Sequence, residues 1–381
     1  MKKRLTSVLL ALVLLLSCSP ATALSESVNE KYLSTAAYLQ QQPIPQVGSI
    51  GGEWLIIGLQ RAGMLPEETA QGYYQNVIKT VTENGSAKLH RSKSTENARV
   101  ILALTAIGKD VTDVAGYNLL EPLADFNYVK KQGVNGPVWT LIAFDSLAYD
   151  IPQMPDVKVQ TSRELLIQTI LDSQSPGGGW DIAGKYADPD MSGMAIQALA
   201  PYYNTHQDVK AAVDSALFVL SKNQQNDGSF NSLNAGSPES SAQMITALSA
   251  LQIHPETDSR FIKNGNSVVS HLMTFSVQNG FSHTGDGEYN QMSTEQSFYA
   301  LTALRRMEEG KTSLYDMCDL LMKYDVNLDG KVNIIDATAV QRYIAELEEF
   351  SLRQLKVIHA DSGKAVDITF VTELQNYIAE Q

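Results

Sequence analysis

The chain has 381 residues, of which 44% are hydrophobic and only 13 are proline. This composition is typical of a globular protein with room for one large and one small domain, and it excludes a largely disordered chain. The formal net charge of −13 argues against a nucleic-acid partner and against an anionic membrane surface, because both reward a basic protein surface.

The N-terminus has the pattern of an export signal. Basic residues at positions 2–4 precede an unbroken apolar run, Val8–Leu16. This run suits the core of a signal peptide and is far shorter than the roughly 20 residues that a membrane-spanning helix needs. Ala21-Thr22-Ala23 offers a cleavage site. We therefore predict a signal peptide over residues 1–23, a secreted protein that is extracellular or attached to a cell surface, and no transmembrane helix.

A second interpretation of the same region is lipidation. Leu15-Leu16-Ser17-Cys18 resembles the lipobox of bacterial lipoproteins, in which the cysteine is acylated and anchors the chain. Leu16 is bulky for that motif, so simple cleavage is the favoured interpretation. In either case only Cys318 remains in the folded part, which excludes an intrachain disulfide and a cysteine-rich zinc site. The six histidines show no zinc-ligand spacing either.

Helical spacing recurs along the chain, and no stretch shows sustained alternation of apolar and polar residues. In one example, Tyr74, Val77, Ile78 and Val81 fall at i, i+3, i+4 and i+7. We therefore predict an all-α fold. The predicted helix starts are Thr161-x-x-Glu164, Ser293-x-x-Gln296 and Ser237-Pro238, and the predicted stop is Asn84-Gly85.

The helices come in related blocks. Gln174-x-x-x-Gly178-x-Trp180 and Gln224-x-x-x-Gly228-x-Phe230 are each followed by a loop and then by a helical run. A shortened third copy begins at Gln278. Matching inner helices are expected to open near Gly52, Ser94 and Gly136.

The period of these blocks indicates the architecture. The aligned residues Leu199, Leu248 and Leu301 lie 49 and 53 residues apart. A repeat near 50 residues is typical of stacked supersecondary units. About six helix pairs fit between residues 30 and 308.

The repeated motifs resemble the QW repeat of the prenyltransferase and squalene-cyclase superfamily. The resemblance implies an α/α toroid over residues 30–308, with inner and outer helices around a central cavity. In that family the glutamine, glycine and aromatic tie an outer helix to the start of the next inner helix. Gln174, Trp180, Gln224 and Phe230 are therefore expected to be structural.

The activities of this superfamily can be tested against the residues present. Protein prenyltransferases use a zinc site of Asp, Cys and His, but Cys318 lies outside the repeats. Cyclases protonate an alkene with the middle acid of Asp-x-Asp-Asp, and in Asp188-Pro189-Asp190-Met191 a methionine replaces the last acid. Neither activity is expected. Residues 190–195 also resemble a stretch of the cobalamin-transport proteins, whose second, β-rich domain this chain lacks.

A few residues of the repeats are candidates for chemistry or ligand binding. Asp190 precedes an apolar run, where we expect it to be a helix N-cap, with a role in the cavity as the alternative. Asp188 or Asp190 paired with Glu295 would supply an acid and a base, so these three are the catalytic candidates. Trp54 and Trp139 stand at expected starts of inner helices, where an aromatic side chain packs in the core or stacks on a sugar or an apolar ligand.

The pattern changes after a polar connection, residues 309–320. Residues 325–336 place oxygen ligands at positions 1, 3, 5, 9 and 12 of a twelve-residue loop, with Gly330 at the sharp turn of position 6. The main-chain carbonyl at position 7 adds one more oxygen, and calcium takes roughly six to eight. The predicted Ca²⁺ ligands are Asp325, Asn327, Asp329, Lys331, Asn333 and Asp336.

Residues 321–381 closely resemble a type I dockerin. Aspartate rather than glutamate stands at position 12, and the loop is followed by Gln341-Arg342-Tyr343-Ile344. A second copy of that motif, Gln375-Asn376-Tyr377-Ile378, lies 34 residues later. The loop before it is degenerate, with only Asp361 and Asp367 left as side-chain ligands. We therefore predict one bound calcium ion rather than two.

The dockerin resemblance implies a partner and a location. Dockerins bind cohesin domains on a scaffold or cell-surface protein, and they gather polysaccharide-degrading enzymes into cellulosome-like assemblies. Ile334 and Ile335 occupy loop positions 10 and 11, which help to set cohesin choice in that family, and Arg342 lies on the following helix. These three are the predicted partner-binding residues, with packing inside the module as the alternative.

Three hypotheses for the function follow. The first is an exported toroid with a binding or accessory role, attached through its dockerin to a cohesin-bearing assembly. The second is a polysaccharide-degrading hydrolase or lyase on a toroid, because dockerins usually carry such cargo. The third is a terpenoid- or corrinoid-binding protein, motivated by the QW repeats and by residues 190–195.

Overall fold

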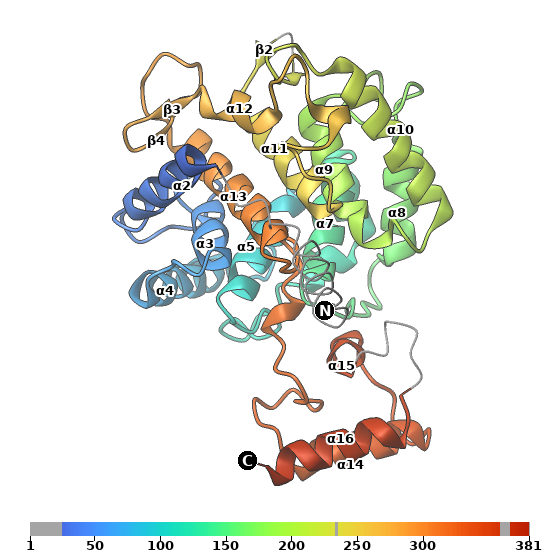
Figure 1. Ribbon diagram of the computed structural model, residues 1–381. Helices are drawn as coiled ribbons and strands as arrows, with labels where there is room; N and C mark the ends of the chain where they lie inside the picture. The colour runs from blue at the N-terminus through green and yellow to red at the C-terminus, as the bar shows by residue number, and fades with distance from the viewer. Residues whose placement is uncertain (1–24, 233–234, 359–365, 381) are drawn as a thin grey trace, which may run out of the picture.

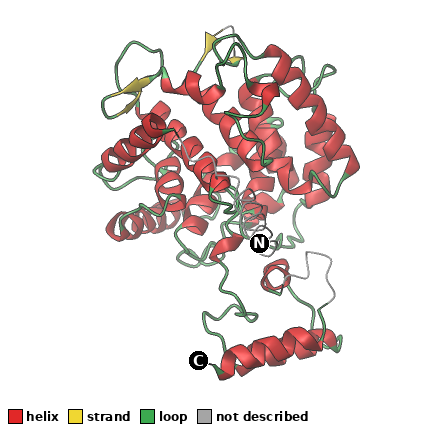
Figure 2. Ribbon diagram, in the orientation of Figure 1, coloured by secondary structure: helices red, strands yellow, loops and turns green. Residues whose placement is uncertain are grey.

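The computed structural model describes residues 25–232, 235–358 and 366–380. Within these ranges the chain is helical, with two short antiparallel strand pairs, so the predicted all-α fold is confirmed (Figure 2). None of the helices in these ranges is long and apolar enough to cross a membrane. The predicted signal peptide, Cys18 included, lies outside the described residues.

Six helices of the described chain form a closed ring, in which each packs against the next and the last packs against the first (Figure 1). In chain order they are α3 (Glu53–Arg61), α5 (Ser94–Ala106), α7 (Asn135–Asp145), α9 (Pro189–Leu199), α11 (Pro238–Ala250) and α13 (Gln291–Glu308). Almost every residue of α5 and α11 is buried. A helix buried on all sides must be enclosed by other elements, so these six form the inner layer.

A second set of helices covers the ring from outside. These are α2 (Glu26–Leu39), α4 (Glu67–Asn84), α6 (Phe126–Val129), α8 (Arg163–Asp172), α10 (Gln207–Asn223) and α12 (Val268–Met273). The long outer helices bury a single stripe, as α10 does with Val209, Val213, Ala216, Leu217 and Leu220. Inner and outer helices alternate along the described chain and make six pairs, as the repeat predicted.

Short elements connect the two layers. The strand pairs are β1 (Asn231–Ser232) with β2 (Ala235–Gly236), and β3 (Ser276–Val277) with β4 (Gly280–Phe281). The 3-10 helices are η1 (Glu121–Ala124), η2 (Lys130–Gln132), η3 (Ala200–Tyr202), η4 (Ser259–Phe261) and η5 (Cys318–Leu320). Each strand pair lies in the loop that leads into an inner helix, α11 or α13.

The repeated glutamines join successive units of the outer layer. Gln174 Nε2 donates a hydrogen bond to the carbonyl of Ala212 in α10 at 2.7 Å. Gln224 Nε2 donates to the carbonyl of Phe261 in η4 at 2.9 Å. Both side chains are structural, but they do not tie an outer helix to the next inner helix, as the family resemblance implied.

The aromatic residue of the motif makes that inner-to-outer connection instead. The indole Nε1 of Trp180 donates to the carbonyl of Ile170 in α8 at 2.7 Å, and its backbone N–H donates to Ser192 Oγ of α9 at 2.8 Å. Trp180 and Phe230 are both buried. The motif therefore holds the ring together through side chains that are inaccessible to a substrate.

The helix ends agree with the sequence signals in part. Ser237 caps α11, and α4 ends at Gly85 with a left-handed φ of +59°, so this start and this stop are confirmed. The two predicted capping boxes are wrong. The N-cap of α8 is Ser162, one residue later than predicted, and the N-cap of α13 is Asn290 rather than Ser293. In both cases a nearby polar residue with extended backbone, one position after the predicted cap in α8 and three positions before it in α13, supplies the oxygen that accepts from the first turn.

The chain then forms a small C-terminal module. Its helices are α14 (Ile334–Ile344), α15 (Leu352–Val357) and α16 (Ile368–Ala379). Helices α14 and α16 lie side by side (Figure 1). They enclose Val326, Val340, Val371 and Leu374 in a hydrophobic cluster separate from that of the ring. The ring and the module therefore each have a core of their own.

Candidate functional site

Acidic side chains gather where the inner helices begin. They are Glu53 of α3, Asp190 of α9, Glu239 of α11 and Glu295 of α13. Ser293 of α13 donates a hydrogen bond to Glu239, and the backbone N–H of Gly51 donates to Glu295 Oε1 at 3.0 Å. The starts of neighbouring helices thus meet at one end of the ring. The positive ends of their dipoles favour carboxylates at this place.

The N-cap of α9 is Asp188, so the prediction that Asp190 caps this helix is wrong. Asp188 Oδ1 accepts from the backbone N–H groups of Asp190 and Met191 at 3.1 and 3.0 Å, and its Oδ2 accepts from Ser232 Oγ at 2.6 Å. Pro189 takes the first helical position, which places Asp190 at the second. Both oxygens of Asp188 are thus engaged in holding the helix start. In contrast, Asp190 Oδ1 is buried and lacks a hydrogen-bond partner among the described residues.

Asp190 has an acidic neighbour that the sequence analysis missed, Glu239. Burial, reinforced by nearby carboxylates that include Glu239, raises the pKa of Asp190 to about 6. Glu239 accepts hydrogen bonds from Ser293 Oγ and from Nδ1 of the half-exposed His283, the latter at 3.1 Å. The available signal was the proline followed by an acid that opens both α9 and α11.

Glu295 lies beside α3. Its carboxylate accepts from the backbone N–H of Gly51 and from Gln291 Nε2 at 2.6 Å. Burial raises its pKa to about 7, and the charge of Glu53 adds to this shift. Helix α11 stands between α9 and α13 in the ring. Different neighbouring carboxylates thus raise the pKa of Asp190 and of Glu295, and acid–base pairing of these two residues stays a prediction.

Aromatic side chains fill the centre of the ring. Trp54 and Trp139, the predicted ligand-cavity candidates, have ring centroids 5.1 Å apart. Tyr299 of α13 lies 5.7 Å from Trp54, and Tyr315 of the connection lies 5.7 Å from Trp139. All four side chains are buried. Both tryptophans thus pack against aromatic side chains of the protein. One of these, Tyr315, comes from outside the repeats.

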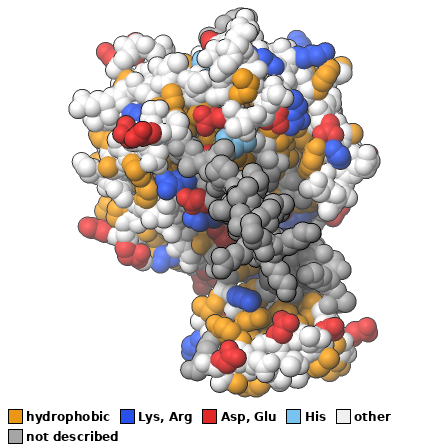
Figure 3. Space-filling model, viewed as in Figure 1, with side chains coloured by type: hydrophobic (Ala, Val, Ile, Leu, Met, Phe, Trp, Pro, Cys, Tyr) orange, Lys and Arg blue, Asp and Glu red, His pale blue; other side chains and the backbone are white. Residues whose placement is uncertain are grey.

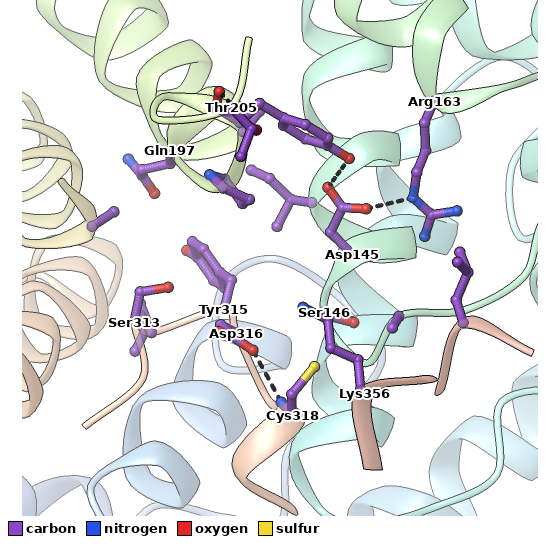
Figure 4. Close-up of a pocket in the computed structure, with 18 of the residues that line it drawn as sticks. Asp145, Ser146, Arg163, Gln197, Thr205, Ser313, Tyr315, Asp316, Cys318 and Lys356 are labelled. Atoms are coloured by element: carbon purple, nitrogen blue, oxygen red, sulfur yellow. Dashed lines mark hydrogen bonds and ion pairs between the residues drawn. The ribbon is translucent and has the colours of Figure 1, made fainter. Parts of the chain in front are cut away.

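A cavity of about 510 Å³ lies at the opposite end of the ring, where α7, α9 and α11 finish. The connection and α15 of the C-terminal module complete its walls. Asp145 and Arg163, an ion pair 2.7 Å apart, lie on one side of the cavity, and Gln197 and Tyr315 lie on the other (Figure 4). Trp54 and Trp139 are not among its lining residues.

The C-terminal loop, residues 325–336, folds around its own carboxylates. Asp325 Oδ1 accepts from the backbone N–H of Asp329 at 3.0 Å, and Asp325 Oδ2 accepts from that of Gly330 at 2.9 Å. Gly330 has a φ of +82°, which a residue with a side chain rarely adopts. The glycine thus provides the sharp turn expected at the sixth loop position.

Asp336 closes the other end of the loop. One of its oxygens accepts from the backbone N–H groups of Val326 and Asn327 at 2.8 and 3.1 Å, and the other accepts from that of Asn333 at 2.8 Å. Asp336 is completely buried, and Asp325 is almost so. Two buried carboxylates in one short loop are costly unless a positive charge compensates them.

The donor set of the loop fits a calcium ion. The predicted ligands are carboxylate, amide and main-chain oxygens, which hard divalent cations prefer, and no nitrogen or sulfur ligand is among them. Within the described ranges, no group of three or more His, Cys, Asp or Glu side chains is arranged as a metal site. The loop's own set relies on two asparagines and one carbonyl as well as on acids.

Residues 323–370 match the family model of the dockerin type I domain. The C-terminal module is a type I dockerin. Dockerins of this type bind Ca²⁺ in EF-hand-like loops, and the domain indicates attachment to cohesin-bearing, cellulosome-like assemblies. Proteins that carry dockerins are typically extracellular components of such assemblies.

Two further comparisons concern the chain as a whole. A solved structure titled "Crystal structure of a protein from Actinoplanes" is 12% identical, covers 74% of this chain and 99% of its own, and superposes with a TM-score of 0.45. No curated protein matches the chain. The relation to the prenyltransferase and squalene-cyclase superfamily therefore stays a prediction.

The dockerin exposes apolar side chains at the start of both of its long helices. Ile334 and Ile335 of α14 are 58% and 57% exposed, and Ile368 of α16 is 63% exposed. Arg342, the third predicted partner-binding residue, is exposed, and its Nε forms an ion pair with Glu348 Oε2 at 3.0 Å. Hydrophobic side chains are visible on the face of the dockerin that Figure 3 presents. Packing inside the module does not account for the two exposed isoleucines of α14.

The two halves of the dockerin begin their helices alike. Asn333 caps α14 by accepting from the backbone N–H of Ile335, and Asp367 caps α16 by accepting from that of Thr369. Asp361, the other ligand left in the second loop, lies outside the described residues. The described part of the second segment therefore keeps its helix cap.

Proposed function

We propose that this protein is an exported helical ring that its dockerin delivers to a cohesin-bearing, cellulosome-like assembly, where the ring has a binding or accessory role. The observation that carries the proposal is the dockerin type I match over residues 323–370. The predicted leader at residues 1–23 agrees with an extracellular destination.

Calcium binding belongs to the same proposal. Asp325, Asn327, Asp329, Asn333 and Asp336 supply side-chain oxygens, and Lys331 supplies its carbonyl. The burial of two of these carboxylates and the left-handed Gly330 support the assignment. When bound, Ca²⁺ would compensate the buried carboxylates and fix the loop at the start of α14. The degenerate second loop supports a stoichiometry of one ion for each chain.

The cohesin contact is proposed to include Ile334, Ile335 and Arg342. The adjacent Ile334 and Ile335 are more than half exposed, and a partner that covers them removes their apolar surface from water, which favours binding. They stand at the end of the loop that calcium would order. Cohesin binding should therefore depend on calcium although the ion itself touches no partner.

The test is binding of the intact chain to a panel of immobilised type I cohesin domains, with calcium and with a chelator. We expect calcium-dependent binding that Ile334→Asp and Ile335→Asp weaken without any loss of bound calcium. Phe218→Asp is the matched control, because Phe218 is 62% exposed on α10 of the ring. A calcium-loaded protein that binds none of the cohesins would refute the proposal.

A polysaccharide-degrading enzyme is the second candidate, and one observation favours it. Asp190 and Glu239 form a carboxylate pair next to the half-exposed His283, and the pKa of Asp190 is raised to about 6. Two neighbouring carboxyl groups, one of which has a raised pKa, are typical of general acid–base catalysis on glycosidic bonds. Release of reducing or unsaturated sugars from plant or microbial glycans, lost in Glu239→Gln, would support this candidate. A wild-type protein that releases no sugar from these glycans would refute the enzyme candidate and leave the binding or accessory role.

A further inference from the structure

We propose that the cavity between the ring and the dockerin binds a small, mostly apolar molecule that carries a hydroxyl group. Its walls include Ile142 of α7, Ala198 of α9, Ala250 of α11 and Leu355 of α15. A volume of about 510 Å³ is within the range of small-molecule sites. This site is separate from the calcium loop and from the predicted cohesin contact, so the proposal goes beyond attachment.

Two residues of the cavity wall each carry a buried polar atom that lacks a partner in the part of the chain that the structure describes. Gln197 and Tyr315 are 6% and 8% exposed, and both line the cavity. Gln197 Oε1 and Tyr315 Oη have no hydrogen-bond partner among the described residues. A buried polar atom left in this way is costly, which makes its place in a folded protein informative.

The orientation of Gln197 is fixed by its neighbours. Its Nε2 donates to Gln243 Oε1 at 2.9 Å, and Gln243 Nε2 in turn donates to Tyr299 Oη at 2.8 Å. Because the amide nitrogen of Gln197 already donates to Gln243, its Oε1 remains available as an acceptor. The phenol of Tyr315 remains available as a donor. A ligand must therefore offer one donor and one acceptor.

A hydroxyl group meets both needs, since its O–H can donate to Gln197 and its oxygen can accept from Tyr315. Figure 4 shows these two residues on the same side of the cavity. The remaining lining is largely apolar and favours a hydrocarbon body.

The ion pair in the cavity wall does not require a charge on the ligand. Arg163 Nε is paired with Asp145 Oδ1, and Arg163 Nη2 donates to the carbonyls of Phe144 and Tyr149 at 3.0 and 2.8 Å. Asp145 Oδ2 accepts from Tyr202 Oη at 2.8 Å. The ion pair on the far wall is thus satisfied within the protein.

A thiol in the cavity provides the readout. Cys318 lines the cavity and is partly exposed, and it is the only thiol of the intact chain once Cys18 is replaced by Ser. The rate of its alkylation by iodoacetamide is measured with increasing 2-naphthol and, for comparison, naphthalene. We expect both to slow alkylation, with 2-naphthol effective at a concentration on the order of tenfold lower, the worth of one or two hydrogen bonds.

Variants separate the two polar contacts from simple burial. Gln197→Leu and Tyr315→Phe should each reduce the preference for 2-naphthol, and together they should remove it. Tyr289→Phe is the control, because this tyrosine precedes α13 at the opposite end of the ring. Without ligand, Tyr315→Phe should melt at the same temperature as the parent or higher, because the substitution removes an unpaired buried hydroxyl.

Three results would overturn the proposal. The first is alkylation that neither compound slows, which would indicate a cavity that holds only water. The second is equal protection by 2-naphthol and naphthalene. The third is a lower melting temperature of Tyr315→Phe together with unchanged binding of 2-naphthol, which would give the hydroxyl a purely structural role.

Discussion

Arg61 of the inner helix α3 holds Asp319 of the connection, with Arg61 Nη1 and Asp319 Oδ1 2.9 Å apart. Arg306 of α13 contacts the other oxygen of the same carboxylate at 2.7 Å. Arg61 also donates to the carbonyls of Leu314 and Asp316. The segment that leads to the dockerin is therefore fastened to the ring rather than a free linker.

Removing this carboxylate should destabilise the ring. Asp319→Ala leaves two buried guanidinium groups without their counter-charge, and because Asp319 itself is about one third exposed we expect a loss of about 2–3 kcal/mol. Urea unfolding monitored by tryptophan fluorescence measures it. Glu309→Ala, which removes solvent-accessible ion pairs with Arg305 and Lys311, should cost less than about 1 kcal/mol. Equal losses for the two variants would contradict the anchoring role.

The same carboxylate predicts how stability responds to acid. Burial acts against ionisation of Asp319, but Arg61 and Arg306 outweigh it and lower the pKa of this group. A lowered pKa in the folded state stabilises the protein above the ordinary pKa of about 3.9 and ceases to do so as the pH falls through the folded value. The unfolding free energy of the parent should therefore fall more steeply below about pH 4 than that of Asp319→Asn. Parallel acid profiles would contradict this.

Calcium titration tests the first loop against the second. We expect one ion for each chain, and Asp325→Ala should weaken its binding by on the order of 100-fold because a buried ligand is lost. Asp367→Ala, in the degenerate loop, should leave the calcium affinity unchanged. Isothermal calorimetry on the intact chain gives both numbers, and two tight sites in the parent would refute the prediction.

The calcium loop could be predicted because its signal is local. Twelve consecutive residues from Asp325 to Asp336 carry the ligands and the glycine, so no distant contact was needed. The cap of α9 was misplaced although Asp188-Pro189 has the same pattern, an N-cap followed by proline, that correctly predicted the start of α11 at Ser237-Pro238.

The cavity and the ring closure could not be predicted in this way. Gly51 and Glu295 are 244 positions apart, and their hydrogen bond exists only because α13 returns to α3. Tyr315 and Gln197 line the same cavity only because the connection, which lies outside the repeats, forms one of its walls. Periodicity indicates that a face is buried but does not name the segment that covers it.

The raised pKa of Glu295 predicts that the free energy of unfolding decreases as the pH rises. Its pKa is raised from 4.5 to about 7, so between these values the folded carboxyl keeps its proton while the unfolded one has ionised. The unfolding free energy should fall through this window by about 3 kcal/mol, and Glu295→Gln should remove most of that fall. Urea unfolding of both proteins across the window is the measurement. An unchanged slope in Glu295→Gln would contradict the assignment.

The glycine of the repeated motif predicts a steric effect. Gly228 has a φ of +88°, and a Cβ at this position would lie 2.2 Å from the carbonyl oxygen of Ser267. Gly265 has a similar φ of +83° but nothing within 4 Å of the same point. Gly265→Ala should therefore cost about 1 kcal/mol for the backbone conformation alone, whereas Gly228→Ala should cost at least about 3 kcal/mol because backbone must move as well.

Gly178 makes this comparison a test of the repeat. It holds the equivalent place in the preceding copy, with a φ of +95° and a Cβ position 2.9 Å from the carbonyl oxygen of Ser215. Gly178→Ala should therefore resemble Gly228→Ala in urea unfolding, or in the yield of folded protein if either variant fails to fold. Because both glycines let the loop pass close to the next outer element, a cost as low as that of Gly265→Ala would show that the motif does not depend on this close approach.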